Sequence, residues 1–341
     1  MKRDIDHILS GHGSGGSMMH QLIEDLFMAR FGNKVLNLRS DAAILKSQAG
    51  MMAFTTDSFV VDPLFFPGGN IGTLAVCGTI NDLVAEGAVP YCLSAAFIIE
   101  EGFPLKELET IVDSMAEEAA NAGVFIATGD TKVVEKSKCD KLFINTSGIG
   151  FFRKDHPTNA DESNAINAGD KIIITGYIGD HGMAVMAARN KLEESISFTS
   201  DCASLNHMLT GICDDPGGIL FMRDPTRGGL ATTLCELARQ IDFGIVIHEK
   251  SIPVRPAVQG FCDLFGYDPL YVANEGKMLI VADPDKAPYI IEKLHRHPLG
   301  RHACMIGEVT PENKHTVGLI TQIGGTRIIN MQAGEQLPRI C

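Results

Sequence analysis

The apolar and polar positions of the chain follow two patterns, which predict its secondary structure. Short runs of apolar and β-branched residues are typical of strands, and longer stretches with apolar residues three or four positions apart are typical of helices. The predicted strands are Met51–Thr56, Cys92–Ile99, Val124–Thr128, Leu142–Phe152, Lys171–Thr175, Gly244–His248, Lys277–Ala282, Ala303–Val309, Thr316–Gln322 and Gly325–Asn330. The predicted helices are Ser17–Phe31, Ile71–Glu86, Pro104–Asn121, Gly182–Asn190, Gly229–Ile241, Pro256–Phe265 and Asp285–His295. Because strands and helices are interspersed, we expect an α/β or α+β protein with mixed sheets.

Two stretches break this pattern and divide the chain. The polar, turn-rich segment 155–169 predicts a boundary between an N-terminal domain at 1–155 and a C-terminal domain at 169–330. The length of 341 residues fits two domains of about 150 residues each. The last stretch, 331–341, has no periodicity and contains Gly and Pro, which predicts a mobile tail.

Composition and charge exclude several classes of protein. The chain has 29 basic and 42 acidic residues, a formal charge of −13, which is poorly suited to nucleic-acid binding. Hydrophobic residues make up 45% and charged residues 21%, which excludes disordered and fibrous proteins. The sequence has neither a signal-peptide core nor an apolar run of about 18 residues, so we expect a cytoplasmic protein without membrane contact.

The cysteines indicate a reduced protein with one exceptional thiol. There are nine at irregular spacing, without a C-x-x-C pair, which argues against a disulfide framework and a zinc ribbon. Most are expected to be buried thiols. Cys341, however, is the last residue of the tail, and the ten steps from Met331 span about 30 Å when extended. The tail therefore predicts a carrier arm.

A glycine-rich loop precedes the first predicted helix. The residues are His12, Gly13, Ser14, Gly15 and Gly16. Backbone N–H groups in such a loop, together with the positive end of the helix, can bind a phosphate. A simple helix cap explains the loop equally well. No Walker A loop and no dinucleotide fingerprint occurs, so a nucleotide would have to bind in another way.

Four aspartates beside small residues predict a cation site. They are Asp41, Asp57, Asp82 and Asp130. At least two lie at predicted strand ends, where open sheets bind ligands. Converging carboxylates repel one another unless a cation lies among them, and oxygen ligands suit Mg²⁺ with phosphates. Lys132 could meet the phosphate charge, although any single Asp is more often a cap or a turn.

Three further motifs combine a charged group with glycine at an element junction. They are GDHG with His181, DPTRGG with Arg227, and NEGK with Glu275. Capping and turn formation are the simpler explanations for each. A zinc site is also conceivable at His295, His297 and His302, but the neighbouring arginines favour a basic helix end.

These motifs together carry a family resemblance that covers essentially the whole chain. They are HGSGG at 12–16, TTDSFVVDPLFFPGGNIG at 55–72, CGTINDLVAEGAVP at 77–90, EEGFP at 100–104, TGDTKVV at 128–134, GDHG at 179–182, DPTRGG at 224–229, NEGK at 274–277 and PRIC at 338–341. The chain resembles the HypE family, the carbamoyl dehydratases of [NiFe]-hydrogenase maturation, within the PurM-like superfamily of ATP-using enzymes. The terminal PRIC is the most discriminating motif, because other PurM-like enzymes lack it.

The resemblance implies a fold, ligands and partners. It implies a PurM-like two-domain fold with a flexible C-terminal tail, and an N-terminal domain that binds ATP and forms a homodimer. Mg²⁺ would be held by the four aspartates, and ATP would contact the loop at His12–Gly16, Asn81, Thr131 and Lys132. A HypF-type carbamoyltransferase would load Cys341, and a HypC–HypD complex would receive the product.

The resemblance also implies a reaction. A carbamoyl group on Cys341 would be dehydrated to a thiocyanate with ADP and phosphate formed, supplying cyanide ligands for the hydrogenase iron. Glu275 is the expected general base, Lys132 would stabilise phosphate charge, and His181 and Arg227 would orient substrate and contact phosphate. The alternatives are a PurM-like synthetase or kinase acting on a free small molecule, and a non-enzymatic thiol carrier.

Overall fold

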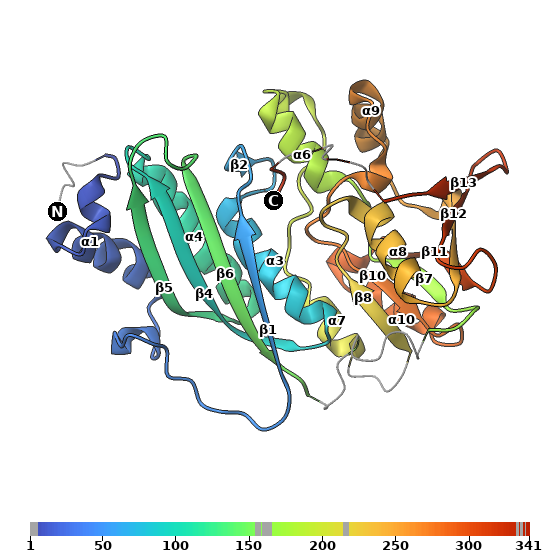
Figure 1. The fold of residues 1–341 in the computed structure, drawn as a ribbon, viewed down its shortest axis with the longest axis horizontal. Coiled ribbons are helices and arrows are strands. Elements are labelled where there is room, and N and C mark those ends of the chain that lie inside the picture. The colour runs from blue at the N-terminus through green and yellow to red at the C-terminus, as the bar shows by residue number, and fades with distance from the viewer. Residues whose placement is uncertain are drawn as a thin grey trace.

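The computed structural model describes residues 6–153, 158, 166–213, 218–331, 334, 337 and 339–341. Most of the predicted boundary segment, 155–169, lies outside these residues, as does part of the tail. The described residues form two halves, each with a sheet and helices, that lie side by side (Figure 1). The predicted mixed α/β fold is confirmed.

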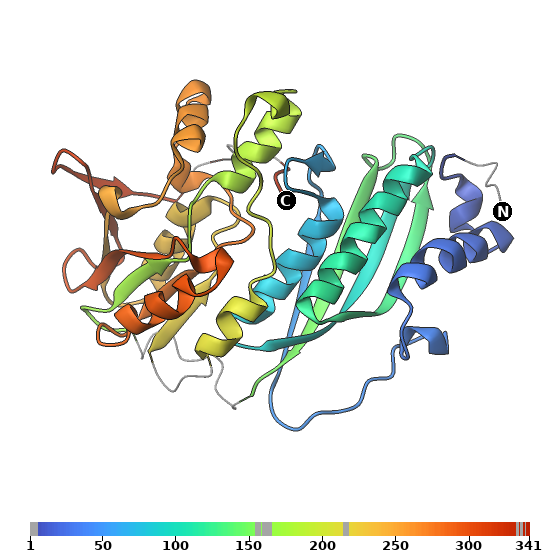
Figure 2. The ribbon, with the colours of Figure 1, turned by 180° about the vertical axis from the view of Figure 1, so that it is seen from behind.

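The N-terminal half is a four-stranded sheet covered by helices on one face. Its strands are β1 (Met52–Phe59), β4 (Val89–Glu100), β5 (Phe125–Val134) and β6 (Leu142–Phe151). Their order is β1-β6-β4-β5, and only β4 and β5 run parallel. Helices α3 (Ile71–Ala85) and α4 (Leu105–Ala122) cover the face seen in Figure 2, whereas Figure 1 looks onto the uncovered face.

Alternating burial explains the two faces of this sheet. Along β1, every second residue is exposed until the strand ends at the buried Phe59. Met52 and Phe54 are 56% and 65% exposed, so the uncovered face carries large apolar side chains. Residues at i and i+2 share a face, and Asp57 and Thr55 therefore point to the helix side.

The remaining N-terminal elements are short. They are the 3-10 helices η1 (Ser10–Gly13) and η3 (Leu36–Leu38), the helix α1 (Ser17–Leu22), a π-helical stretch η2 (Ile23–Met28), α2 (Ala29–Phe31), and the strand pair β2 (Phe65–Phe66) and β3 (Gly69–Asn70). The predicted helix Ser17–Phe31 is thus continuous but changes helix type in the middle. The pair β2–β3 was not predicted, because two-residue strands carry no periodicity.

The C-terminal half contains a seven-stranded sheet of order β13-β12-β9-β11-β7-β10-β8. Its strands are β7 (Lys171–Ile174), β8 (Ile219–Arg223), β9 (Gly244–His248), β10 (Leu279–Ala282), β11 (Cys304–Thr310), β12 (Val317–Ile320) and β13 (Thr326–Ile329). Its helices are α6 (Asp180–Arg189), α7 (Asn206–Cys213), α8 (Gly229–Gln240), α9 (Pro256–Phe265) and α10 (Ala287–His295), with short 3-10 helices between them. Of these, β8 and α7 were not predicted, although the equally short β9 was.

The hydrophobic core shows that the halves are joined rather than merely adjacent. One cluster of buried side chains runs from the N-terminal helices and sheet into α6, α7 and α10. A second cluster lies under α8 within the C-terminal half. In β7, Ile173 belongs to the first cluster and Ile172 and Ile174 to the second, so this sheet separates the two clusters. In the part of the chain described, no helix is long and apolar enough to cross a bilayer.

Candidate active site

A cavity of about 280 Å³ lies between the two halves. Residues of β1 and α3 form one wall, and the segment after β8, the segment before β10 and the end of the tail form the other. The polar residues that line it include Asp57, Asp82, Asp224, Arg227, Glu275 and Cys341. Five of these six belong to the residues predicted from the sequence.

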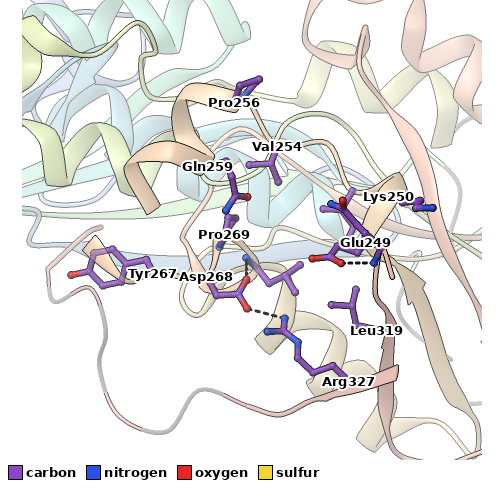
Figure 3. A pocket seen from close by; sticks show the side chains of 13 residues that line it. Glu249, Lys250, Val254, Pro256, Gln259, Tyr267, Asp268, Pro269, Leu319 and Arg327 are labelled. Carbon is purple, nitrogen blue, oxygen red and sulfur yellow. Dashed lines mark hydrogen bonds and ion pairs between the residues drawn. The ribbon is translucent and has the colours of Figure 1, made fainter. Parts of the chain in front are cut away.

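A larger cavity, of about 530 Å³, contains none of the predicted residues. It lies in the C-terminal half beside η6 (Pro269–Tyr271) and β13, and Figure 3 shows that Glu249, Asp268 and Arg327 pair with neighbours. Arg327 contacts Asp268 at 2.8 Å, and Glu249 accepts a hydrogen bond from the backbone of Gln322 at 2.7 Å. We therefore take the smaller cavity as the candidate site.

Two carboxylates face each other across β1 and α3. The Thr55 hydroxyl donates to Asp82 Oδ2 at 2.8 Å, which links the helix to the strand. Gly78, one helical turn before Asp82, leaves room for the ring of Phe59 at the end of β1, whose Cζ would lie 3.0 Å from a Cβ at that position. The absence of a side chain at residue 78 lets the strand and the helix approach each other closely.

Burial and mutual repulsion disfavour charge on these carboxylates. Burial, followed by the charge of Asp57, raises the pKa of Asp82 to about 6. Burial, followed by the charge of Asp82, raises the pKa of Asp224 to about 7. Burial, followed by the charge of Asp224, also raises the pKa of Asp57. Such a group of carboxylates is relieved by a cation, and its oxygen donors fit a hard divalent ion.

Glu275 lies next to this carboxylate group and is almost completely buried. Burial raises the pKa of its carboxyl group well above the ordinary value, and nearby carboxylates, Asp224 first among them, raise it further. Among the described residues, Oε1 has no hydrogen-bond partner. The Glu275 carboxyl is thus an unpaired buried group beside the end of the tail.

The described end of the tail is docked into the cavity. Val60 N–H donates to the Cys341 carbonyl and Asp62 N–H donates to the Arg339 carbonyl, each at 3.2 Å, so the tail pairs with the chain just after β1. Arg189 of α6 donates to the Asp62 carbonyl at 2.9 and 2.5 Å and to the Arg339 carbonyl at 3.0 Å. Ile340 is 4% exposed. The mobility of the tail stays a prediction.

His181 binds the tail from α6. Its Nε2 lies 2.9 Å from the Ile340 carbonyl and its Nδ1 lies 2.8 Å from Ser200 Oγ. A carbonyl only accepts, so Nε2 carries the proton and Ser200 donates to Nδ1. Burial lowers the pKa of this imidazole, which fits an uncharged ring. His181 therefore holds the carbonyl that precedes Cys341.

The Cys341 thiol lies between a cation and a carboxyl group. Burial, followed by the charge of Glu275, raises its pKa to about 12, and Arg227, which hydrogen-bonds the thiol, partly offsets the rise. The Cys341 charge in turn raises the pKa of Arg227. The docked thiol is consequently protonated at neutral pH and is a poor nucleophile in this position.

The other predicted site residues lie elsewhere in a single chain. Asp130 and Lys132 form an ion pair of 2.9 Å on β5, and their register with Ala96 and Ile98 assigns them to the uncovered face of the sheet. Thr131 is buried on the opposite face. Asp41 is exposed in a loop before β1. One chain therefore does not bring the four predicted aspartates together, and the part described contains no cluster of three or more acidic, His or Cys ligands.

The glycine loop packs against β5, at the far edge of the sheet from the cavity. A side chain at Gly13 would meet the backbone nitrogen of Val133 at 2.7 Å, so glycine is required by this close contact. His12 caps the loop by accepting from Leu9 N–H at 2.9 Å. Ser14 donates to the Gly11 carbonyl, and Gly15 has a positive φ of 77°. Gly16 is the N-cap of α1.

Asn81 has a different position from the one expected of a nucleotide ligand. Its side chain is 1% exposed and bonds only main-chain atoms, among them the Glu275 carbonyl at 3.1 Å.

Sequence reasoning did not select Asp224 as a ligand, although it opens the DPTRGG motif. It also missed Asp201 and Arg189, for which no sequence signal exists, since each acts on a backbone distant in the chain.

The remaining predictions concern histidines and thiols. His295 bonds the Ala303 carbonyl, His297 caps a short helix by accepting from Leu299 N–H, and the ring of His302 lies tilted against that of Tyr177, with 4.6 Å between the centroids. These roles fit the basic helix end better than a zinc site. The cysteines described are free thiols, as expected.

Comparisons with known proteins agree with the motifs. The family model for the N-terminal domain of AIR synthase related proteins matches residues 39–152, and that for the C-terminal domain matches 167–320. A carbamoyl dehydratase HypE of Rhizobium leguminosarum bv. viciae is 50% identical over 346 residues, covering 100% of this chain and 98% of that protein.

Solved structures give the same result. A hydrogenase maturation protein HypE in complex with ATP superposes with a TM-score of 0.93 at 45% identity, covering 98% of this chain and 100% of that one. A chain of a HypE–HypF complex superposes with a TM-score of 0.78 at 45% identity, covering 91% of this chain and 99% of that one. The chain therefore belongs to the HypE family of carbamoyl dehydratases, within the AIR synthase related proteins of PurM-like fold.

Proposed function

We propose that this protein is an ATP-dependent carbamoyl dehydratase whose substrate is a carbamoyl group on its own Cys341, in hydrogenase maturation. The observation that carries the proposal is the docked thiol, which shares one cavity with Glu275, Arg227 and three carboxylates from both halves. The names of the relatives support it, as does the ATP bound to one of them.

The reaction needs a leaving group and a base. The thiocarbamate oxygen attacks the γ-phosphorus of ATP, the bond from that phosphorus to the ADP oxygen breaks, and an O-phosphorylated imidate forms. One N–H proton is lost as the imidate forms, and loss of the remaining N–H proton with departure of phosphate then leaves Cys341–S–C≡N, so that ATP and the thiocarbamate give thiocyanate, ADP and phosphate.

Residues of the chain supply the other requirements. Arg227 beside the thiol holds negative charge that develops on phosphate oxygens. Glu275 is the candidate base, and it is suited to this role once its neighbouring carboxylates are neutralised. His181 fixes the tail carbonyl, and hence the reach of the substrate. Because sulfur is not the nucleophile in this step, a docked thiol with a raised pKa is compatible with it.

Among the described residues of one chain, the carboxylates do not form a metal cluster by themselves, so a divalent ion would be bound together with ATP. Asp57, Asp82 and Asp224 would hold Mg²⁺, which would neutralise the phosphates of ATP when bound. Asp41, Asp130, Thr131, Lys132 and the loop at His12–Gly16 remain proposed ATP and metal contacts. None of them lines the cavity of the same chain, and β5 is at the far edge of the sheet from β1, so they can complete this cavity only if a second copy supplies them.

A homodimer would provide that second copy. The uncovered face of the N-terminal sheet exposes Met52, Phe54 and Ile98, and its edge strands β1 and β5 are unpaired on their outer sides in one chain. Two such sheets closed edge to edge would make an eight-stranded barrel, an arrangement that buries this face and removes both edges. The β5 edge of one copy would then lie beside the cavity of the other.

The partners follow from the chemistry. A HypF-type carbamoyltransferase would load Cys341, as the complex of a relative with HypF supports. A HypC–HypD complex would accept the cyanide. A reducing cytoplasm would keep the thiol available. The domain roles stay as expected: 1–155 for ATP binding and dimerisation, 169–330 to complete the cleft, and 331–341 as the arm.

An intact-mass measurement tests the proposal. Carbamoylated protein mixed with ATP and Mg²⁺ should lose the mass of one water molecule and release one ADP per chain. Cys341→Ala should accept no carbamoyl group yet still bind ATP. A carbamoylated protein whose mass stays constant while ATP is present would contradict the proposed reaction, and ATP turnover independent of Cys341 would instead favour a free small-molecule substrate.

A further inference from the structure

As the candidate base, Glu275 has to direct its carboxyl group at the tail. Among the described residues, no hydrogen bond of Oε1 fixes the direction of that group. Oε1 is buried and has no hydrogen-bond partner in the part of the chain described. Without a hydrogen bond on Oε1, the direction of this side chain depends on its packing and on the backbone that carries it. The contacts of that backbone therefore help to decide the geometry of the candidate base.

The peptide groups on either side of Glu275 are held by two buried side chains. Glu275 N–H donates to Asp201 Oδ1 at 3.2 Å, and the Glu275 carbonyl accepts from Asn81 Nδ2 at 3.1 Å. Asp201 belongs to the segment between η4 (Glu193–Ser195) and α7 in the C-terminal half, and Asn81 belongs to α3 in the N-terminal half. Residue 275 is thus gripped from both halves at once.

Asp201 is itself rigidly held. Its side chain is 3% exposed and forms an ion pair with Lys277, whose side chain is 9% exposed, with 3.0 Å between Nζ and Oδ2. Gly276 N–H approaches Oδ2 at 3.4 Å. The backbones are so close that a Cβ on Gly276 would lie 1.8 Å from the Asp201 carbonyl oxygen. This contact excludes any other residue at 276.

Asn81 is equally fixed. Its Nδ2 also donates to the Ala203 carbonyl at 3.0 Å, and its Oδ1 accepts from Leu205 N–H at 2.9 Å. It precedes Asp82, which lines the cavity. The turn of α3 that presents the cavity carboxylate therefore also fixes the wall that carries Glu275.

We propose that Asp201 and Asn81 are positioning residues that aim Glu275 at Cys341 by holding the backbone of residue 275 from both sides. The inference rests on the proposed function, since it gives Glu275 a task. It agrees with the neighbouring contact of Ser200, which holds the imidazole of His181 on the tail carbonyl. Consecutive residues 200 and 201 thus hold both the thiol-bearing tail and the carboxyl group.

Asp201→Asn tests this role in two ways. In Asn an NH₂ group, which cannot accept, replaces one of the two oxygens that accept from the N–H groups of residues 275 and 276. Hydrogen exchange of these two amides, resolved by electron-transfer fragmentation, should therefore become faster by roughly tenfold or more. In carbamoylated protein the single-turnover rate of water loss should fall roughly 10- to 100-fold, because misplacement by an ångström has that effect. The ATP concentration for half-maximal rate should change less than about twofold, because Asp201 does not line the cavity.

Asp180→Asn is the matched control. Asp180 is also a buried carboxylate in an ion pair, 2.9 Å from Arg255, and it lines the same side cavity as Asp201. It makes no hydrogen bond to residues 275–277 among those described. In Asp180→Asn, hydrogen exchange of the amides of residues 275 and 276 and the single-turnover rate of water loss should stay within about twofold of the wild-type values.

Further variants keep the test decisive. If the unpaired Lys277 prevents folding of Asp201→Asn, the double variant Asp201→Asn with Lys277→Met removes the ion pair but still lacks one acceptor. Asn81→Asp should behave like Asp201→Asn, because a carboxylate cannot donate to the Glu275 carbonyl.

Unchanged hydrogen exchange at residues 275 and 276, an unchanged rate of water loss, or an equal loss of rate in the Asp180→Asn control would overturn the proposal. A wild-type protein that loses no water would refute the proposed function, and the exchange rates alone would then decide whether residue 275 is clamped.

Discussion

The thiol of Cys341 is the residue whose environment changes its chemistry most. At pH 8, a thiol with a pKa of about 12 is ionised in about one molecule in 10⁴, whereas an ordinary thiol near 8.5 is ionised in about a quarter. Release of the tail should therefore raise alkylation by iodoacetamide on the order of 10³-fold. Docking and loading are consequently incompatible states of the same residue.

Arg189→Met tests this difference at the residue scale. It removes three hydrogen bonds that hold the backbone at Asp62 and Arg339. Alkylation of Cys341, followed by peptide mass spectrometry, should be far faster than in wild type, while the buried Cys77 stays unreactive as an internal control. Equal rates in the two proteins would show that the thiol is not protected by docking.

The cavity carboxylates predict a pH dependence of stability. The pKa values of Asp82 and Asp224 are about 6 and 7 in the folded protein and near 3.8 when unfolded. Between these values the folded state binds more protons, so their contribution to stability is fully present below pH 4 and is lost as the pH rises to about 7. Without divalent ions, the melting temperature should fall from pH 5 to pH 8.

Asp224→Asn should flatten this fall, because one of the carboxylates no longer titrates. Mg²⁺ should raise the melting temperature more at pH 8 than at pH 5 in the wild type. A melting temperature that rises from pH 5 to pH 8 in both proteins would contradict the assignment.

Single residues were predictable where a motif carried them. Asp57, Asp82, Arg227, Glu275 and Cys341 stand in recognisable motifs, and the fold brings them to one cavity. Asp201 was not predictable, because its contacts join residues 74 and 75 positions apart and depend on the path of the chain.

At the scale of elements, the tight crossing of the NEGK turn and the segment at Asp201 is the most demanding contact. Gly276→Ala should lower the free energy of unfolding by about 3 kcal/mol, since its Cβ would fall 1.8 Å from a backbone oxygen. Denaturant unfolding measures this.

Gly260→Ala in α9 is the contrasting variant. A Cβ there meets nothing within 4 Å, so the change should raise the free energy of unfolding by about 0.5–1 kcal/mol through helix propensity. Similar losses in both variants would mean that glycine content, rather than the crossing, sets the stability.

The long periodic helices and most strands were predicted, including strands of four or five residues such as β7 and β9, but some short elements were not. The predicted helix Pro104–Asn121 corresponds to α4, whose apolar stripe faces the sheet. The five-residue β8 and the eight-residue α7 were missed, since their formation depends on neighbours supplied by the fold.

At the scale of the whole molecule, the uncovered sheet face predicts dimerisation. Phe54, on the edge strand β1 of this face, is 65% exposed, and Phe54→Asp should convert a dimer to a monomer in sedimentation equilibrium. Ile323→Asp, which changes a 96% exposed residue in the C-terminal half, should leave the dimer intact. A wild-type protein that sediments as a monomer would refute the barrel arrangement.

The fold class and two-part organisation were predictable from pattern and length, but the union of the halves was not. Buried amides bridge them: Asn81 reaches residues 203, 205 and 275, and Asn206 Nδ2 donates to the Ala122 carbonyl at 2.8 Å. Such contacts leave no periodic trace in the sequence.

The core that runs through both halves limits how the protein can be recombined. A chimera of two relatives joined near residue 160 would combine an α3 from one parent with the 199–206 segment from the other, across a tightly packed interface. A functional chimera would need that segment, and the tail that docks just after β1, to come from the same parent as the N-terminal half. The residues that must be exchanged together are therefore discontinuous in the sequence, although the two family models divide the chain only once, between residues 152 and 167.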